Sequence, residues 1–378
     1  MMTKRGNGEG SIFKRTDGRW AATLDLGYTD GKRRRKTFYG KTRREAQEQL
    51  TAALRTRQQG LPVITERQTI AEFLRRWLRD SARPQLRPLT YVTYEGIVEH
   101  HLIPAFGPLQ LQALTPQHVQ RFLNDRSAAG LAPATVRNIL RVLHRSLEIA
   151  ARWGLVARNV ASLVDGPRMV RSEVRPLTPE EARRFLDAVA GDRLEALYTV
   201  ALATGLRQGE MLGLRWSGVD LTRGTITVTT ALQLIDGAPR LVEPKSATSR
   251  RVVVLPAIAV DALRRHRASQ LEERLRVGEA WNAEWDLVFA GPTGDPLSSR
   301  SLRDAFKRHL KAAELGDSRF HDLRHSCASL LLAQGVPARV VMETLGHSSI
   351  QMTLNTYSHV MPVLTRQAAD SMDAALRA

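Results

Sequence analysis

The sequence has little cysteine and no long apolar run. Its 378 residues include one cysteine, Cys327, which excludes an internal disulfide framework and a cysteine-rich zinc module. No window approaches the ~18 unbroken apolar residues of a membrane span. The basic N-terminus, MMTKRGNGEGSIFKRTDG, lacks the apolar stretch of a secretion signal. We therefore expect a protein of a reducing cytoplasm with no membrane partner.

Acidic residues are also few relative to basic ones. Lys and Arg number 56 against 38 Asp and Glu, which gives a net charge of +18 and a pI near 10.9. Residues 1–65 hold fifteen of the basic and six of the acidic residues, so half of the net charge lies in this segment. A field of this size attracts polyanions and favours a nucleic-acid partner over a role in solubility alone.

Three runs of alternating residues near the N-terminus predict a small antiparallel sheet. They are SIFKR, RWAATLDLGY and KRRRKTFYG, separated by Asp17-Gly18 and Asp30-Gly31, and Asp-Gly is a strong hairpin signal. The following TRREAQEQLTAALRTRQQ has one apolar helical stripe, which can cover one face of the sheet. The stripe consists of Ala46, Leu50 and Leu54.

The third run is strongly basic, and the uncovered face of the sheet is a candidate DNA reader. A β-ribbon fits the major groove. The alternative is a solvated basic edge that discourages aggregation. The candidate DNA contacts are Lys32, Arg33, Arg34, Arg35 and Lys36.

After a linker around Gly60 and Pro62, the period from Thr69 to about Trp153 is helical. Four apolar stripes with short connections predict a compact bundle, and Thr115-Pro116 is a helix start. The stripes are Ile70, Phe73, Leu74, Trp77; Tyr91, Tyr94, Ile97, Val98; Val119, Phe122, Leu123; and Ala134, Ile139, Leu143, Leu147, Ala150.

Three arginines on the last of these helices have i, i+4, i+8 spacing. They are Arg137, Arg141 and Arg145. The spacing is compatible with a ridge that tracks phosphates and equally with a solvated helix face.

A second linker, DGPRMVRSEVRPLTPEE, leads to a helix start at Thr178-Pro179. The remainder reads as mainly helical, interrupted over residues 224–256 by a small antiparallel sheet with a turn at Asp236-Gly237. We therefore predict a multidomain fold, mainly α with small antiparallel sheets. The predicted domains span residues 1–60, 67–168 and 175–378.

The last region holds three short stretches that could bind an anion or transfer a proton. In ALATGLRQGEM, Gly205 is followed by Arg207 at a helix start, and Glu210 one turn later can orient the guanidinium. In SRFHDLRHSCASLLLAQG, the i, i+3 spacing places His321 and Arg324 on one helix face. ETLGHSSIQMTLNTYSHV adds His347 after a glycine bend and then Tyr357.

A metal site is the weaker interpretation of the second stretch. His321, His325 and Cys327 lack a fourth nearby ligand, and the two histidines do not enclose a glutamate as in H-E-x-x-H. We expect His325 and Cys327 to be packed side chains.

The order Arg207, His321-x-x-Arg324, His347 and Tyr357 resembles the tyrosine recombinase, or phage integrase, family. The resemblance covers the whole chain and implies an arm-type DNA-binding domain, a helical core-binding domain and a catalytic domain. The family also uses a lysine in a hairpin between its first arginine and the His-x-x-Arg, and Lys245 in EPKSATSRRVVVLP matches it.

The resemblance implies a recombinase that needs neither metal, nor other cofactor, nor ATP. Tyr357 would attack the scissile phosphate and form a 3′-phosphotyrosyl intermediate. The other matched residues would stabilise charge or move protons, and Glu210 would hold Arg207. The predicted catalytic residues are Arg207, Lys245, His321, Arg324, His347 and Tyr357.

The implied partners are double-stranded DNA, at core and arm-type attachment sites, and three further copies of the chain in a homotetramer. A directionality factor or a DNA-bending protein is compatible with this assembly. The arm-type domain favours integration and excision of a mobile element such as a prophage. The alternatives are a dimer-resolving or topoisomerase-like enzyme of the same chemistry and a non-catalytic DNA-binding regulator.

Overall fold

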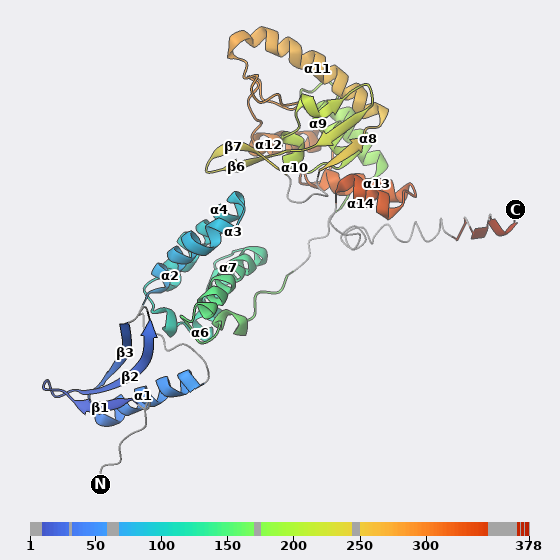
Figure 1. The fold of residues 1–378 in the computed structure, drawn as a ribbon. Coiled ribbons are helices and arrows are strands. Elements are labelled where there is room, and N and C mark those ends of the chain that lie inside the picture. The colour runs from blue at the N-terminus through green and yellow to red at the C-terminus, as the bar shows by residue number, and fades with distance from the viewer. Residues whose placement is uncertain are drawn as a thin grey trace. The chain divides into compact units, whose positions relative to one another are not determined.

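A computed structural model of the chain is shown as a ribbon in Figure 1. Within the part of the chain that it describes, no helix has both the length and the apolar composition needed to cross a membrane. The described residues are 10–29, 32–58, 68–169, 175–243, 250–346, 369–370, 372–373 and 375–377.

The N-terminal region is a three-stranded antiparallel sheet with a helix packed on one face (Figure 1). Its elements are β1 (Ser11–Lys14), β2 (Trp20–Thr29), β3 (Lys32–Gly40) and α1 (Arg43–Gln58). Strand alternation places Ala22 and Leu24 on the helix side, where both are fully buried. Ala46 and Leu50 of α1 are buried against them and Leu54 is partly buried, which confirms the predicted stripe.

The first predicted hairpin is longer than a two-residue turn. Arg15 to Arg19 form the connection between β1 and β2, closed by a 2.8 Å hydrogen bond from Arg15 N to Arg19 O. Asp17 accepts hydrogen bonds from the backbone and guanidinium of Arg19, and Gly18 adopts φ +82°. The Asp17 carboxylate therefore stabilises a wider loop than the Asp-Gly pair predicted. The Asp30-Gly31 turn lies outside the described residues.

The second region is a helical bundle that includes two π-helical segments. Its elements are α2 (Ile70–Trp77), η1 (Leu78–Ala82), α3 (Arg83–Gln85), α4 (Pro88–Ile97), η2 (Val98–Leu102), α5 (Ile103–Phe106), η3 (Leu111–Ala113), α6 (Pro116–Ala128), α7 (Pro133–Arg152) and η4 (Val160–Leu163). Thr69 and Thr115 accept hydrogen bonds at the starts of α2 and α6, so the predicted cap at Thr115 is confirmed.

The predicted apolar stripes form the core of this bundle, with one error. Trp77 stacks on Tyr94 with ring centroids 6.1 Å apart, and Ile139 and Leu143 of α7 are buried in the same cluster. Ala134 is exposed, because it lies in the first turn of α7, ahead of the buried positions that start at Val136. The predicted stripe therefore begins one turn too early in α7.

The third region is mainly helical with two small sheets. Its elements are α8 (Pro179–Ala188), α9 (Glu195–Thr204), α10 (Gln208–Leu212), η5 (Trp216–Gly218), β4 (Val219–Asp220), β5 (Thr225–Val228), β6 (Ala231–Ile235), β7 (Ala238–Val242), β8 (Arg251–Val254), α11 (Ala257–Val277), η7 (Gly278–Ala280), α12 (Ser299–Ala312), α13 (Asp322–Ala333) and α14 (Ala338–Leu345). Thr178 caps α8 through a reciprocal bond with Glu181, as its sequence predicts.

The strands expected to form one sheet divide into two. β4, β5 and β8 make a three-stranded antiparallel sheet, whereas β6 and β7 form a separate hairpin. The hairpin turn has φ 51° at Asp236 and 76° at Gly237. Positive φ at both turn residues matches the right-handed strand twist, which explains the tight two-residue connection.

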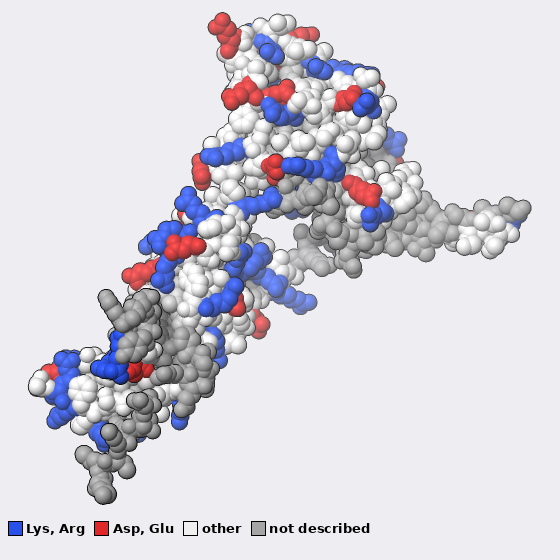
Figure 2. All heavy atoms as spheres, viewed as in Figure 1, with Lys and Arg blue, Asp and Glu red and all other residues white. Residues whose placement is uncertain are grey.

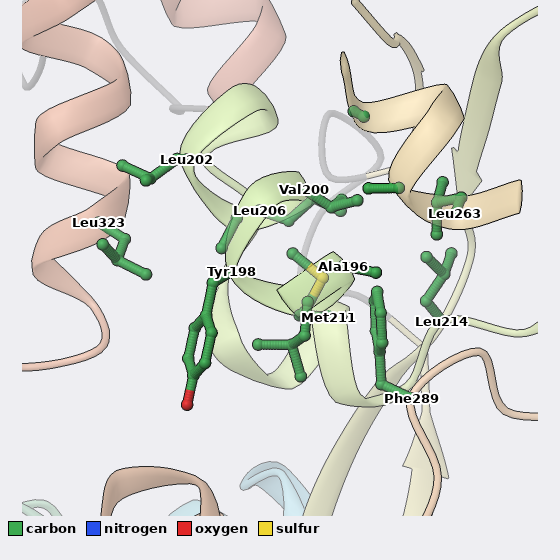
Figure 3. Close-up of a cluster of buried hydrophobic side chains, with 14 of the residues drawn as sticks. Ala196, Tyr198, Val200, Leu202, Leu206, Met211, Leu214, Leu263, Phe289 and Leu323 are labelled. Carbon is green, nitrogen blue, oxygen red and sulfur yellow. The ribbon is translucent and has the colours of Figure 1, made fainter. Parts of the chain in front are cut away.

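Helix α9 runs through the core of this region. Its side chains are buried from Ala196 to Leu202 and again at Thr204, as is expected of a helix that is apolar on all sides. Figure 3 shows Tyr198 of α9 among the side chains of this core, with Met211 and Phe289. The C-terminal end of α9 therefore has a fixed place inside the domain.

Near the C-terminus the described residues 369–370, 372–373 and 375–377 are helical, and Met372 and Leu376 are exposed.

Candidate active site and DNA interface

Helix α9 ends at a glycine that the packing requires. Gly205 has φ +60°, and a Cβ atom there would lie 2.3 Å from Cδ2 of Leu345 and 3.4 Å from the Cys327 side chain. A residue with a side chain would be strained and would collide with Leu345. The end of α9 is thus in direct contact with the end of α14.

Arg207 directly precedes α10 and is held by Glu210. The Glu210 carboxylate accepts a 2.7 Å hydrogen bond from Nη1 of Arg207 and a 3.0 Å bond from its backbone N–H. Arg207 Nη2 also donates to the carbonyl of Gly346 at 2.8 Å. The predicted contact of Arg207 with Glu210 is confirmed. The bond to Gly346 joins Arg207 to the residue that precedes His347.

Arg324 reaches the same place from α13. Its Nη1 donates a 2.7 Å hydrogen bond to the carbonyl of Gly205. The predicted helix start is confirmed, because α13 begins at Asp322 and His321 precedes it. The two side chains differ in burial: Arg324 is 3% exposed, whereas His321 is exposed. Arg324 turns inward, where the Gly205 carbonyl at the end of α9 accepts this hydrogen bond.

His321 is poised as a neutral imidazole. Although the residue is exposed, partial burial of its ring, followed by the charges of His325 and Arg324, lowers the pKa of His321 to about 4. The rings of His321 and His325 are 5.4 Å apart and nearly perpendicular. At neutral pH His321 is therefore uncharged, and its unprotonated ring nitrogen can accept a hydrogen bond or a proton, as a weaker base than an ordinary histidine.

Arg251 belongs to this cluster, and the sequence analysis missed it. Its Nη2 lies 3.0 Å from Oε2 of Glu210, and its Nε donates a 2.9 Å bond to the carbonyl of Thr344. Strand alternation offered a signal, because Arg251 is two residues from the buried Val253 and shares its face of β8.

Glu210 is 4% exposed and lies between two guanidinium groups. Burial alone would raise its pKa, but the hydrogen bond and charge of Arg251, followed by the backbone and side-chain hydrogen bonds of Arg207, bring the pKa of Glu210 below its usual value. Glu210 is therefore ionised at neutral pH and can hold both arginines.

Three predicted catalytic residues, Lys245, His347 and Tyr357, lie outside the described residues. β7 ends at Val242 and β8 begins at Arg251, so both strands that flank Lys245 are described. α14 ends next to Gly346, whose φ of 68° produces the predicted bend before His347. The roles of these three residues stay predictions.

Cys327 packs in the protein interior. It is 2% exposed and belongs to a cluster with Ala328, Leu332 and Val341. Burial raises the pKa of the Cys327 thiol to about 12. A thiol in this environment acts as a small apolar side chain.

The basic run of β3 is divided between the two faces of the sheet. Lys36 pairs with Leu24, so it lies on the face that α1 covers, where its ammonium is 5.6 Å from the centre of the Phe38 ring. Arg35 pairs with Asp25 on the open face, and Arg33 forms an ion pair with Asp25. Lys36 therefore does not share the open face with Arg35, because adjacent residues of a strand point to opposite faces. The predicted DNA contacts of β3 stay predictions. Lys32 and Arg34 belong to β3, and the structure describes no side-chain position for them.

Aromatic side chains also lie on the open face. Phe13 pairs with Ala21, and Ala21 pairs with Tyr39, so the three residues form a row across the sheet. Phe13 is 49% exposed and Tyr39 47% exposed. The guanidinium groups of Arg15 and Arg19 lie 5.2 and 5.9 Å from the Tyr39 ring centre. This row is not among the DNA contacts predicted from the sequence.

The three arginines of α7 have different surroundings. Arg137 and Arg141 are exposed, whereas Arg145 is half-buried with its guanidinium 5.7 Å from the Tyr94 ring centre. Arg137 and Arg141 line a hollow of about 460 Å³ together with Leu140, His144 and Met169, among others. Figure 2 shows Lys and Arg side chains spread along the visible face of this bundle.

Comparison with known proteins gives two family matches. Residues 175–362 match the phage integrase family, and residues 69–126 match the phage integrase N-terminal SAM-like domain. An integrase of Streptomyces ambofaciens is 31% identical, over 96% of this chain and 96% of its own length. A XerC-like tyrosine recombinase of Caldanaerobacter subterraneus is 29% identical, over 94% of this chain and 95% of its own length.

Solved structures show the same fold at low sequence identity. The Tn1549 transposon integrase bound to transposon right-end DNA has a TM-score of 0.66 and 20% identity, covering 82% of this chain and 100% of that one. The lambda integrase tetramer bound to a Holliday junction has a TM-score of 0.56 and 18% identity, covering 93% of this chain and 96% of that one.

The described part of the site, an ionised glutamate that holds two arginines and a third arginine bonded to Gly205, suits chemistry on an anionic ester. With the family matches and the 31% identical integrase, it shows that the chain belongs to the phage integrase family of tyrosine recombinases. It is a site-specific DNA recombinase.

Proposed function

We propose that this recombinase cuts and rejoins DNA through a 3′-phosphotyrosyl bond formed by Tyr357. One observation carries the proposal: hydrogen bonds join Arg207 to Gly346 and Arg324 to Gly205. Three distant segments of the chain, which contain or adjoin four of the six predicted catalytic residues, therefore meet at one place. Such convergence of cations and a proton acceptor is what phosphoryl transfer without a metal requires.

In the proposed reaction, Tyr357 Oη attacks the scissile phosphorus and the bond from phosphorus to the 5′-oxygen breaks. His321, neutral because its pKa is lowered, takes the tyrosine proton. Lys245 gives a proton to the departing 5′-oxygen. A 5′-hydroxyl of a second DNA strand then attacks the phosphotyrosine and reverses these steps.

Arg207 and Arg324 bind the non-bridging phosphate oxygens in this scheme, and His347 donates a further hydrogen bond to them. The Arg207 side chain is 38% exposed and is within reach of a phosphate. Arg324 is 3% exposed in the free chain, so its phosphate contact requires a rearrangement around α13 when DNA binds.

The proposed biological task is integration and excision of a mobile element such as a prophage. The open face of the N-terminal sheet supports it, since exposed Phe13, Tyr39 and Arg35 suit contact with a second class of DNA site. We assign residues 1–60 to arm-type sites, 67–168 to core sites and 175–378 to catalysis. A homotetramer on two duplexes in the cytoplasm completes the proposal, with room for directionality or DNA-bending factors.

The test is to mix the protein with supercoiled DNA that carries its candidate attachment region, add EDTA, quench with detergent and isolate covalent protein–DNA adducts. Wild type should form an adduct with a blocked 3′ end, and Tyr357→Phe should bind DNA equally but form none. A nicked substrate that traps the cleaved state serves as a second assay. DNA binding without any adduct on either substrate would instead support a non-catalytic regulator.

A further inference from the structure

Arg251 is a buried arginine with a definite set of partners. Its side chain is 8% exposed, and its two terminal nitrogens lie 3.4 and 3.0 Å from the two oxygens of Glu210. A guanidinium facing a carboxylate with two nitrogens fixes the plane of that carboxylate. Glu210 uses the same two oxygens to hold the side chain and backbone of Arg207. The orientation of Arg207 therefore depends on a group that Arg251 holds.

Arg251 also contacts the bend that precedes His347. Its Nε donates to the Thr344 carbonyl at 2.9 Å. A Cβ on Gly346 would lie only 2.9 Å from Arg251 Nη1 and 3.0 Å from its Cζ, so the guanidinium packs directly on this glycine. Arg207 donates to the carbonyl of the same glycine. The two arginines thus bind the C-terminal end of α14, where the helix dipole favours positive charge.

A second arginine–glutamate pair in the same domain has similar contacts but makes no hydrogen bond with Arg207. Arg193 places two nitrogens 2.7 and 2.8 Å from the oxygens of Glu273, and its Nη1 donates to the Ala290 carbonyl at 2.8 Å. The pattern of a carboxylate and a backbone carbonyl is the same as for Arg251. The Glu273 carboxylate accepts no hydrogen bond from Arg207, so this pair provides a matched control.

We propose that Arg251 is a positioning residue for strand cleavage. It acts through Glu210 to set the orientation of Arg207, and through Thr344 and Gly346 to set the end of α14 immediately before His347. The inference rests on the proposed role of Arg207 at the scissile phosphate. Arg251 itself contacts neither the phosphate nor the nucleophile in this scheme.

The main test is Arg251→Met in the full-length chain on a nicked, trapping DNA substrate at saturating protein. We expect the first-order rate of adduct formation to fall by ~10–100-fold, the usual loss when a residue that orients a ligating group is removed. The Kd for DNA should stay within about threefold, because Arg251 is buried. Folded fraction is checked by circular dichroism under the assay conditions.

The pH profile gives a readout that a purely structural role would not change. Without Arg251, the pKa of Glu210 should rise, since Arg251 contributes most to lowering it. The acid limb of the cleavage rate should then move to higher pH in Arg251→Met. Adding Glu210→Gln to Arg251→Met should abolish this shift, because glutamine does not titrate. Arg251→Lys, which keeps the charge but loses the two-nitrogen contact, should keep the wild-type limb with an intermediate rate.

Arg193→Met is the control for loss of a partly buried ion pair and should leave the rate and pH profile unchanged. Equal rate losses in Arg193→Met and Arg251→Met, or an unshifted acid limb, would overturn the inference. If Arg251→Met is too unstable to assay, Arg251→Lys becomes the deciding variant, because a wild-type rate in that variant would overturn the proposal.

Failure of the proposed function gives a different result. It fails if wild type forms no adduct, or if Arg207→Lys cleaves normally. Normal cleavage by Arg251→Met beside inactive Arg207→Lys and Tyr357→Phe rejects only the role of Arg251.

Discussion

Arg324 and Gly205 are joined by a 2.7 Å hydrogen bond across 119 positions of sequence. The bond connects α13 to the end of α9, two residues before Arg207. Gly205 also contacts Leu345, and Arg207 bonds to Gly346, so α9, α13 and α14 meet at one point. The position of each cation therefore depends on the other two segments.

Replacement of Gly205 by alanine should be far more harmful than the same change at Gly191. Both glycines have positive φ, which costs alanine about 1 kcal/mol, but a Cβ at Gly191 meets nothing within 4 Å. At Gly205 the clash with Leu345 should add about 2 kcal/mol. Urea denaturation of both variants measures the difference. Equal losses of unfolding free energy would show that Leu345 moves away without cost.

Arg207→Lys should lower the rate of adduct formation by ~100-fold or more, because lysine cannot bind two atoms with a planar group. DNA affinity should change little. Arg215→Lys is the control, since Arg215 also donates to backbone carbonyls, those of Glu284 and Trp285. Single-turnover cleavage at saturating DNA measures both, and a normal rate for Arg207→Lys would contradict its placement at the phosphate.

His321 should titrate with a midpoint near 4 in the free protein. Its pKa is about 6.5 in an unfolded chain, so the unfolded state binds more protons between these values. The stability that neutral His321 contributes is complete above pH 6.5 and is lost as pH falls toward 4. NMR of histidine-labelled protein, assigned with His321→Asn, measures the midpoint. A midpoint above about 7 would leave the ring mostly protonated at neutral pH and would argue against a neutral proton acceptor.

Cys327 should be unreactive in the folded protein. Burial and a pKa of about 12 leave almost no accessible thiolate at pH 8. A chromogenic disulfide reagent should therefore label one thiol per chain in denaturant and almost none without it. Rapid labelling in native buffer would indicate that the contact between α13 and α14 opens readily.

Arg35→Gln should weaken binding to arm-type DNA more than Lys36→Gln does. The two changes remove one charge each from adjacent residues, but only Arg35 lies on the open face. Loss of one phosphate contact should lower the slope of log K against log salt by about 1. Titrations of the isolated arm-type DNA at several salt concentrations give both slopes. Equal effects would point to a general field rather than a face-specific contact.

The sequence by itself determined what depends on short spacing. Thr178 and Glu181 predict a helix start, and Arg207 and Glu210 predict an ion pair one turn apart, because neighbours in a helix meet wherever the helix lies. The stripes of α1 and of the bundle also followed from periodicity. The prediction that Ala134 belongs to the buried stripe was wrong, because periodicity does not show where a helix leaves the core.

Only the tertiary structure decided which distant groups share a site. Arg251 bonds to Glu210 and Thr344, and Arg324 turns inward to Gly205, because packing brings together β8, α10, α13 and α14. Strand alternation separates Arg35 from Lys36, but only the packing of α1 decided which of the two lies on the covered face. Such contacts join residues far apart in the chain, and local patterns contain no information about which partner a buried guanidinium will find.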